Sequence, residues 1–260
     1  MASDTTKTKA QELMRLHSDP ALLAVVNVWD VISAKVVADV EGTTAIATAS
    51  HAVAASMGYE DGENIPLDLH LDLVRRIVEA TDLPVTADLE GGYGDAAETV
   101  RRAIGIGVVG ANIEDQLKPL PEAAAQVEAI MRVAEQEGVE FVLNARTDAF
   151  ALRRGGDAEE SLRDAIERGR AFLDAGAPLV FVPAFLDETQ IARLVDEFGP
   201  QRVSVIGIPG MPPLKRMEEL GVARVSYGPL PQSVALTALQ DMAIDVVNGG
   251  GVPQGFRLLS

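Results

Sequence analysis

Residues 84–115 read PVTADLEGGYGDAAETVRRAIGIGVVGANIED and contain the repeating unit from which we predict the fold. An apolar run, Pro84–Leu89, precedes an amphipathic segment, Asp95–Ile106, and a second apolar run, Val108–Ile113. Short runs rich in Val, Ile and Ala are typical of parallel strands buried on both faces. Asp95 and Gly107 stand where helices commonly begin and end. The stretch therefore predicts a β–α–β unit.

The same alternation continues along the whole chain. The other apolar runs are Leu22–Val28, Thr44–Ala49, Glu140–Ala145, Leu179–Pro183, Val203–Ile208 and Arg224–Tyr227. The other amphipathic segments include Leu67–Ala80, Pro121–Glu137, Ala158–Ala175 and Glu188–Phe198. Eight strand–helix units with right-handed crossovers favour a closed (β/α)8 barrel. A doubly wound open sheet fits less well, because no strand opens a dinucleotide-binding glycine motif. We expect one domain over residues 1–260, with a short flexible tail from Asn248 to Gly255.

Composition excludes several classes of function. With 260 residues, 47% of them hydrophobic, the chain has enough apolar material for a large core. It contains no cysteine, so disulfides, thiolate metal sites and cysteine nucleophiles are excluded. A net charge of −17 disfavours binding to nucleic acid or to anionic membranes. There is no signal peptide or membrane-spanning stretch, so we expect a soluble, cytoplasmic protein.

Acidic residues gather where the third and fourth predicted strands end. Asp88 and Glu90 share a face by alternation, and Glu114 closes the next strand. In a barrel, function concentrates at the carboxyl ends of the strands. Three carboxylates without histidine or thiolate form a set of hard oxygen donors suited to Mg²⁺ or Mn²⁺. The alternative is that these residues cap helices or face solvent.

The fifth strand and the loop after the second carry candidate substrate ligands. Asn144 and Arg146 share a face, so the guanidinium is expected at the barrel mouth, where it can bind a carboxylate. An inter-strand salt bridge with Glu114 or Asp148 is its structural alternative. Small residues from Ala47 to His51 lead into a helix start, where backbone N–H groups can bind an anion. A structural role for His51 competes with a catalytic one.

Five motifs in order resemble the isocitrate lyase/phosphoenolpyruvate mutase superfamily, over roughly residues 20–230. They are Asn27–Asp30, Gly-Tyr-x-Asp-Gly at Gly58–Gly62, Asp88-x-Glu90-Gly-Gly-Tyr-Gly, Ile113-Glu114-Asp115 and Asn144-Ala-Arg-Thr-Asp148. The resemblance implies a modified barrel whose last helix is exchanged between subunits of a homodimer or homotetramer. An apolar C-terminal helix, Ser233–Val247, suits such exchange, although packing on its own barrel is the ordinary alternative.

The resemblance also implies roles for individual residues. Mg²⁺ would be held by Asp88, Glu90 and Glu114, partly through water, with Asp61 near the ion. The substrate would be a small 2-oxo or 2-hydroxy carboxylate, bound by Arg146 and Asn144. Its oxyanion would be held around Thr48, Ala49, Ser50 and His51. Arg146, Asp61 and Glu114 are the candidate catalytic residues. Breaking a bond next to a carbonyl leaves an enolate, whose charge such a site stabilises.

The chain departs from the family pattern in the loop after Glu114. Isocitrate and methylisocitrate lyases carry a Lys-Lys/Arg-Cys-Gly-His stretch there, and this chain has Asp-Gln-Leu-Lys118-Pro instead. Lys118 is the loop's only acid–base candidate, and a solvated surface lysine is its alternative. The leading hypothesis is a lyase, or related hydrolase or decarboxylase, acting on an oxaloacetate-like acid. The alternatives are phosphorus–carbon bond chemistry, as in a phosphonopyruvate mutase or hydrolase, and a catalytically silent barrel that acts as a sensor or scaffold.

Overall fold

A computed structural model describes residues 1–152 and 156–259. Its helices are α1 (Asp4–Ser18), α2 (Val31–Ala38), α3 (Ser50–Ser56), α4 (Leu67–Glu79), α5 (Ala96–Gly105), α6 (Leu120–Glu137), α7 (Ala158–Asp174), α8 (Glu188–Phe198), α9 (Leu214–Leu220) and α10 (Leu230–Val247). Its strands are β1 (Leu23–Val25), β2 (Asn27–Val28), β3 (Ile46–Thr48), β4 (Val85–Asp88), β5 (Gly110–Glu114), β6 (Val142–Arg146), β7 (Leu179–Val182), β8 (Val203–Ile206) and β9 (Arg224–Ser226). Every apolar run predicted as a strand overlaps one, or two in the case of Leu22–Val28, and the predicted and observed bounds differ by at most two residues.

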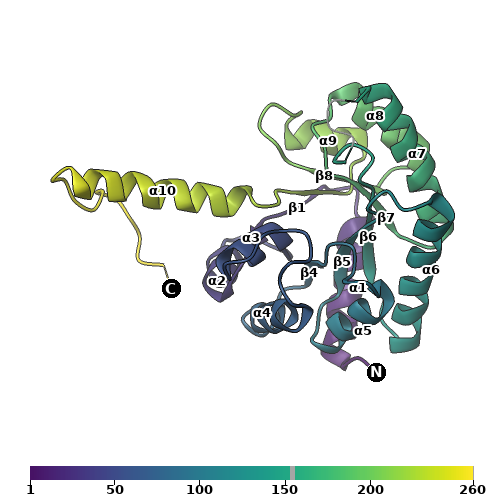
Figure 1. Cartoon of the computed structure of the whole chain (residues 1–260), viewed down its shortest axis with the longest axis horizontal. Helices are drawn as coiled ribbons and strands as arrows, with labels where there is room; N and C mark the ends of the chain where they lie inside the picture. The colour runs from purple at the N-terminus through teal and green to yellow at the C-terminus, as the bar shows by residue number, and fades with distance from the viewer. Residues whose placement is uncertain (153–155, 260) are drawn as a thin grey trace.

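The strands form one parallel sheet that closes into a barrel (Figure 1). The order is β1-β9-β8-β7-β6-β5-β4-β3-β2, and β1 and β2 are two halves of one strand interrupted at Val26. β1 pairs with β9 and β2 pairs with β3, so the interrupted strand joins the two ends of the sheet. Asn27 fastens this junction, because its Nδ2 donates to the Thr48 carbonyl (2.8 Å) and its Oδ1 accepts from the Tyr227 N–H (2.7 Å). The predicted (β/α)8 barrel is confirmed.

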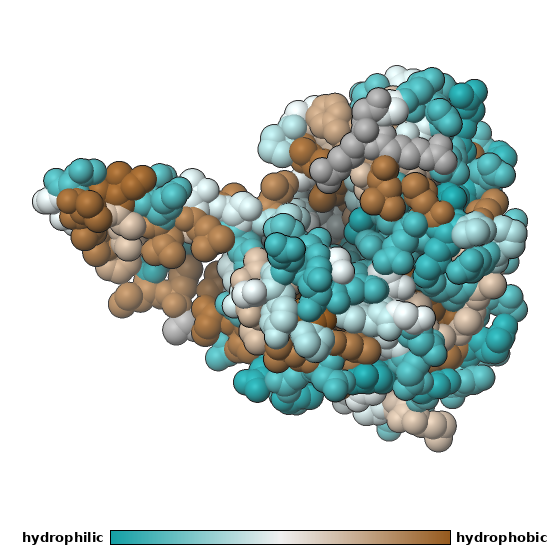
Figure 2. Space-filling view, viewed as in Figure 1, coloured by the Kyte–Doolittle hydropathy of each residue, from teal (hydrophilic) through white to brown (hydrophobic). Residues whose placement is uncertain are grey.

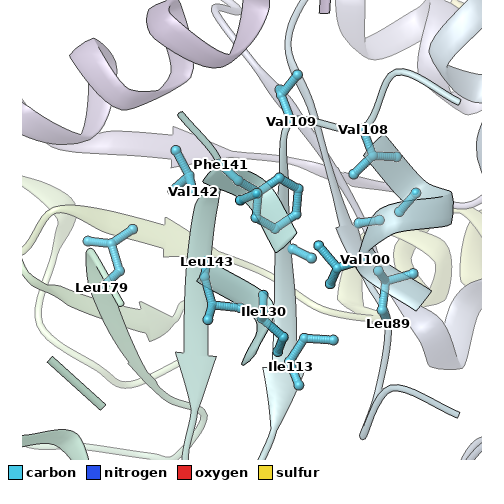
Figure 3. Packing of buried hydrophobic residues seen from close by; sticks show 14 of the residues in the cluster. Leu89, Val100, Val108, Val109, Ile113, Ile130, Phe141, Val142, Leu143 and Leu179 are labelled. Carbon is cyan, nitrogen blue, oxygen red and sulfur yellow. The ribbon is translucent and has the colours of Figure 1, made fainter. Parts of the chain in front are cut away.

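The quoted β–α–β unit shows how the apolar pattern builds the core. Asp95 caps α5 by accepting from the Glu98 N–H at 3.0 Å, and the helix buries Val100 and Ile104 against the sheet. Figure 3 shows these contacts continuing through Ile130 of α6 and the strand residues around it. The core therefore holds β4 and β5 in register and fixes where their carboxyl ends lie.

The N-terminal helix α1 closes the opposite end of the barrel, near the starts of the strands. It buries Ala10, Leu13 and His17. Gly110 opens β5 at this end, and a Cβ there would lie 2.9 Å from the Leu13 Cδ2 atom. The absence of a side chain at Gly110 thus lets α1 approach the barrel closely.

Beyond its first turn, where Gln232 is buried and donates to the Ala52 carbonyl, the C-terminal helix α10 does not pack on its own barrel. It projects from the barrel as a separate rod, and apolar side chains run along it (Figures 1 and 2). Val234, Leu239 and Ile244 are 70%, 57% and 55% exposed. The helix itself was predicted correctly, but ordinary packing on its own barrel is wrong for this chain. None of the described helices is both long and apolar enough to cross a membrane.

Candidate active site

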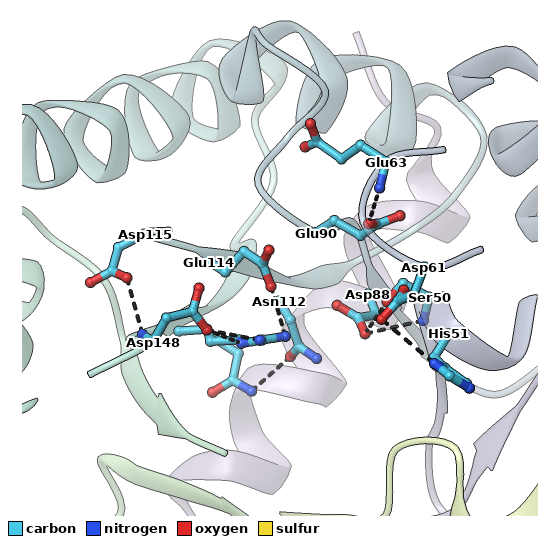
Figure 4. A network of polar contacts seen from close by, with 12 residues as sticks. Ser50, His51, Asp61, Glu63, Asp88, Glu90, Asn112, Glu114, Asp115 and Asp148 are labelled. Carbon is cyan, nitrogen blue, oxygen red and sulfur yellow. Dashed lines mark hydrogen bonds and ion pairs between the residues drawn. The ribbon is translucent and has the colours of Figure 1, made fainter. Parts of the chain in front are cut away.

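The candidate site lies at the carboxyl ends of β3 to β6. Strand register aligns Asp88 of β4 with Asn112 of β5, and Asn112 with Asn144 of β6. Two residues further along, Glu114 of β5 aligns with Arg146 of β6. The barrel therefore brings the predicted acidic residues and the arginine to one mouth, where Figure 4 shows the labelled acidic side chains.

Asp88 is held by the loop after β3. Its Oδ2 accepts from both the N–H and the hydroxyl of Ser50, at 3.1 and 3.0 Å. Its own N–H donates to the Thr48 Oγ1 at 3.0 Å. The other carboxylate oxygen, Oδ1, is buried and has no hydrogen-bond partner among the described residues. Thr48 and Ser50, predicted as substrate ligands, thus orient Asp88 here, and Ala49 between them is buried at the start of α3.

Glu90 is fixed on both oxygens. Its Oε1 accepts from the Tyr93 hydroxyl at 2.9 Å, and its Oε2 accepts from the Glu63 N–H. His70 Nδ1 lies 2.8 Å from the same hydroxyl and donates to it, because the hydroxyl proton is used toward Glu90. Glu90 also has a positive φ of 55°, a conformation that few non-glycine residues adopt. Burial raises the pKa of Glu90.

Arg146 lies between two carboxylates. Its Nη1 is 2.7 Å from the Glu114 Oε2, and its Nη2 is 2.8 Å from the Asp148 Oδ1. The inter-strand salt bridge expected as a structural alternative is therefore present. Arg146 nevertheless keeps 23% of its side chain exposed to the mouth.

Burial and these contacts together shift the pKa values of all three groups. Burial raises the pKa of Glu114 to about 8, against the opposing effect of Arg146, and the charges of Asp148, Asp88 and Glu90 add to the rise. Burial also raises the pKa of Asp148. Burial acts to lower the pKa of Arg146, but its two carboxylate partners outweigh burial and raise it. The mouth thus contains carboxyl groups that favour a proton or a further positive charge.

The loop after β5 is held in place by hydrogen bonds to neighbouring elements. Asp115 accepts from the Asp148 N–H at 3.0 Å and from Arg168 of α7 at 3.1 Å. Gln116 and Leu117 both have positive φ, 49° and 53°, so the chain turns sharply there. Lys118 Nζ donates to the Gln126 side chain at 2.7 Å. The predicted acid–base candidate is therefore engaged with α6.

The remaining predicted residues lie at the rim or below the mouth. His51 and Asp61 form a loose pair of 3.7 Å at the rim, with side chains 58% and 45% exposed. Asn144 is fully buried, and its Nδ2 donates to Asn112 (2.8 Å) and to Ser204 (3.3 Å) inside the barrel. Asn144 thus lies beneath the mouth, and no described contact brings it to the surface of the site.

The donor set suits a divalent cation that keeps some of its water. In the described part of the chain, no three histidine or carboxylate side chains lie close enough together to enclose an ion by themselves. Asp88 Oδ1 is a free, buried oxygen, whereas Glu90 and Glu114 are already hydrogen-bonded. Mg²⁺ retains several waters and commonly takes only one or two carboxylates directly. Direct ligation by Asp88, with Glu90 and Glu114 acting through water, fits these contacts.

Two functional candidates were missed by the sequence reasoning. Glu63 and His70 lie far from Glu90 in the chain, and neither stands at the end of a predicted strand. The only sequence signal for Glu63 was its position directly after the Gly58–Gly62 motif. Nothing in the pattern around His70 separates it from an ordinary helix residue.

Comparison with known proteins shows which family the chain belongs to. The sequence profile of the phosphoenolpyruvate phosphomutase family matches residues 13–247. An uncharacterized protein of Mycobacterium tuberculosis (strain H37Rv) is 33% identical, over 75% of this chain and 74% of its own length. An oxaloacetate decarboxylase of Rhodopseudomonas palustris (strain BisB18) is 32% identical, over 73% of this chain and 68% of its own. The crystal structure of a candidate phosphonomutase from Burkholderia cenocepacia J2315 superposes with a TM-score of 0.85, 40% identity and coverage of 90% and 98%.

Proposed function

Since this chain belongs to the phosphoenolpyruvate phosphomutase family, within the isocitrate lyase/phosphoenolpyruvate mutase superfamily, we propose that it is a Mg²⁺-dependent lyase of a small 2-oxo or 2-hydroxy carboxylate. The observation that carries the proposal is the carboxylate of Asp88. Ser50 anchors one of its oxygens, and the other is buried and has no hydrogen-bond partner among the described residues, near Arg146 and its two carboxylate partners. A bound Mg²⁺ or Mn²⁺ would polarise the substrate carbonyl and stabilise negative charge.

The residues of the chain supply the rest of the chemistry. Arg146 binds the substrate carboxylate with its exposed edge, and its charge stabilises the enolate that forms when the neighbouring bond breaks. Glu114, whose pKa is raised to about 8, is able to hold or release a proton near neutral pH. Asp61 and His51 line the rim through which substrate enters.

Oxaloacetate is the first substrate to test. The similarity to an oxaloacetate decarboxylase supports an oxaloacetate-like acid. The short loop at Asp115–Lys118 supports it as well, because this loop lacks the cysteine with which larger hydroxy acids are cleaved in related lyases. Phosphorus–carbon chemistry is the second candidate, favoured by the 40% identity to the candidate phosphonomutase.

A substrate panel with a matched pair of variants tests the proposal. Purified protein is assayed with Mg²⁺ against oxaloacetate, phosphonopyruvate, 2-methylisocitrate and dimethylmalate. We expect turnover of oxaloacetate, which Asp88→Ala or a chelator removes almost completely. Asp82→Ala is the matched control, because Asp82 is an exposed acid three residues before the start of β4, away from the mouth. Full activity after chelation contradicts the metal assignment, and turnover of phosphonopyruvate alone favours the second candidate.

We also propose that the chain assembles into a homodimer or homotetramer by exchanging α10. The exposed apolar residues of α10 support this, as do Ile32 of α2 and Leu214 of α9, which are 53% and 41% exposed. In a barrel of eight units the last helix would lie between those two helices. Light scattering at micromolar concentration is expected to give a dimer or tetramer, and a chain ended after Pro229 a smaller species. A monomeric full-length chain contradicts exchange.

A further inference from the structure

A second arginine lies inside the barrel, below the candidate site. Arg224 opens β9 and is only 1% exposed. Within the described part of the chain its only hydrogen bond, from Nη1 to the Thr86 Oγ1, is long at 3.4 Å. Its Nε and Nη2 have no hydrogen-bond partner among the described residues. A buried guanidinium without a bonded carboxylate is costly, so its retention needs a reason.

The histidine near Arg224 does not compensate the charge. His17 of α1 donates from Nδ1 to the Leu13 carbonyl at 2.7 Å, which leaves Nε2 as an acceptor. Burial first, and the charge of Arg224 second, lower the pKa of His17 to about 3. His17 is therefore neutral at physiological pH and brings no second positive charge to the interior.

Asp88 is the charge that acts on Arg224. Burial lowers the pKa of Arg224 to about 10, and the carboxylate of Asp88 opposes that effect. Thr86, which contacts Arg224, lies two positions before Asp88 on β4, so the two side chains share a face of the strand. Arg224 thus lies beneath Asp88, whose buried Oδ1 has no hydrogen-bond partner among the described residues.

The charges of the site support a role for this arrangement. Asp88, Glu90, Glu114 and Asp148 bring four carboxyl groups to the mouth, whereas Arg146 and Arg224 bring two guanidinium groups. A divalent cation at the mouth would be attracted by the excess of acidic groups and repelled by Arg224. Without Arg224 the site would hold the cation more tightly and would repel a carboxylate ligand.

We propose that Arg224 is a positioning residue that acts as the fixed counter-charge of Asp88 and balances the affinity of the mouth for a divalent cation against its affinity for an anionic ligand. The proposal rests on the proposed metal site. Because Arg224 works through its charge, its removal has opposite effects on the two ligands, which loss of packing alone does not produce.

Binding measurements on Arg224→Met and Arg224→Lys test this directly. We expect Arg224→Met to bind Mn²⁺ alone several-fold more tightly by titration calorimetry, and to bind oxalate, at saturating Mn²⁺, about tenfold more weakly. Arg224→Lys keeps the charge and is expected to stay within about twofold of the wild type for both. Unchanged affinities, or parallel losses for both ligands, overturn the proposal.

A metal-free stability cycle tests the coupling independently of the proposed function. Asp88→Asn removes the counter-charge of Arg224 and is expected to lower Tm by about 5 °C or more. Adding Arg224→Met to Asp88→Asn is expected to recover part of that loss, whereas adding Arg224→Lys is not. Strictly additive Tm changes overturn the proposal even if the protein proves to be a metal-dependent lyase. If Arg224→Met does not fold in the wild-type background, Arg224→Gln replaces it in both experiments.

Discussion

The two arginines of the barrel occupy opposite environments. Arg146, at the mouth, contacts two carboxylates within 2.8 Å and is partly exposed. Arg224, in the interior, is fully buried and contacts no carboxylate among the described residues. The planar guanidinium of Arg146 can exchange a protein carboxylate for the carboxylate of a substrate and bind it through two N–H groups. Arg224 can act on the site only through its positive charge.

Because of this difference, we expect lysine to replace Arg224 but not Arg146. A lysine carries the same charge but lacks the planar pair of donors that a carboxylate binds. Substitution by lysine therefore separates a role that depends on bidentate geometry from one that depends on charge. The same substitution at both positions turns the comparison into an experiment.

The largest expected effect is that of Arg146→Lys. We expect kcat/KM to fall at least about 100-fold, because one ammonium cannot hold Glu114, Asp148 and a substrate carboxylate in the same geometry. Tm is expected to change by only a few degrees, because the positive charge remains. Arg224→Lys, assayed in parallel on the substrate found by the panel, is expected to retain most activity.

Two results with Arg146→Lys and Arg224→Lys would contradict this prediction. A wild-type rate in Arg146→Lys would move the carboxylate-binding site elsewhere in the mouth. Equal losses of kcat/KM in the two variants would show that both arginines act through the geometry of the guanidinium and not through charge alone.

The next effect concerns stability in acid at the closed end of the barrel. The folded pKa of His17 is about 3, below its ordinary value near 6.5, so its contribution to stability is complete above pH 6.5 and is lost as pH falls toward 3. By pH 5 the loss amounts to about 2 kcal/mol. Urea unfolding at pH 7.5 and 5.0 is expected to show a drop smaller by about that amount in His17→Gln than in the wild type. Equal drops would show that His17 titrates normally.

Most of the fold was predictable because the pattern of burial is local. The run Pro84–Leu89 is typical of a strand buried on both faces, and the same reasoning located the other strands. The interruption at Val26 was not predictable, since it depends on Asn27 bonding to Thr48 and to Tyr227, 200 residues away. The position of α10 was also ambiguous, because an apolar helix has the same sequence whether its partner is its own barrel or another chain.

The candidate site was predictable where it follows strand ends. Asp88, Glu114 and Arg146 end neighbouring strands, so the barrel itself brings them together. Arg224 was not found because it begins a strand, and the start of a strand normally indicates a structural role. The hydrogen bonds of Ser50 to Asp88 were also missed, because the sequence shows a serine at a helix start but not which oxygen its N–H will bind.

The smallest effect is expected at Lys118, on the loop between the mouth and α6. Its ammonium group donates to the side chain of Gln126 in α6 at 2.7 Å. No described contact joins Lys118 to Glu114 or Arg146. A group that moved a proton during turnover would need to reach the substrate within hydrogen-bond distance. We therefore expect Lys118→Met to change kcat by less than about threefold, with an unaltered pH–rate profile.

A loss of two orders of magnitude in kcat, together with the disappearance of a basic limb from that profile, would show that the loop moves and that Lys118 supplies the proton after all. In that case Gln126→Ala, which releases the lysine, should raise the rate rather than lower it, so the two variants together separate a resting hydrogen bond from a catalytic one.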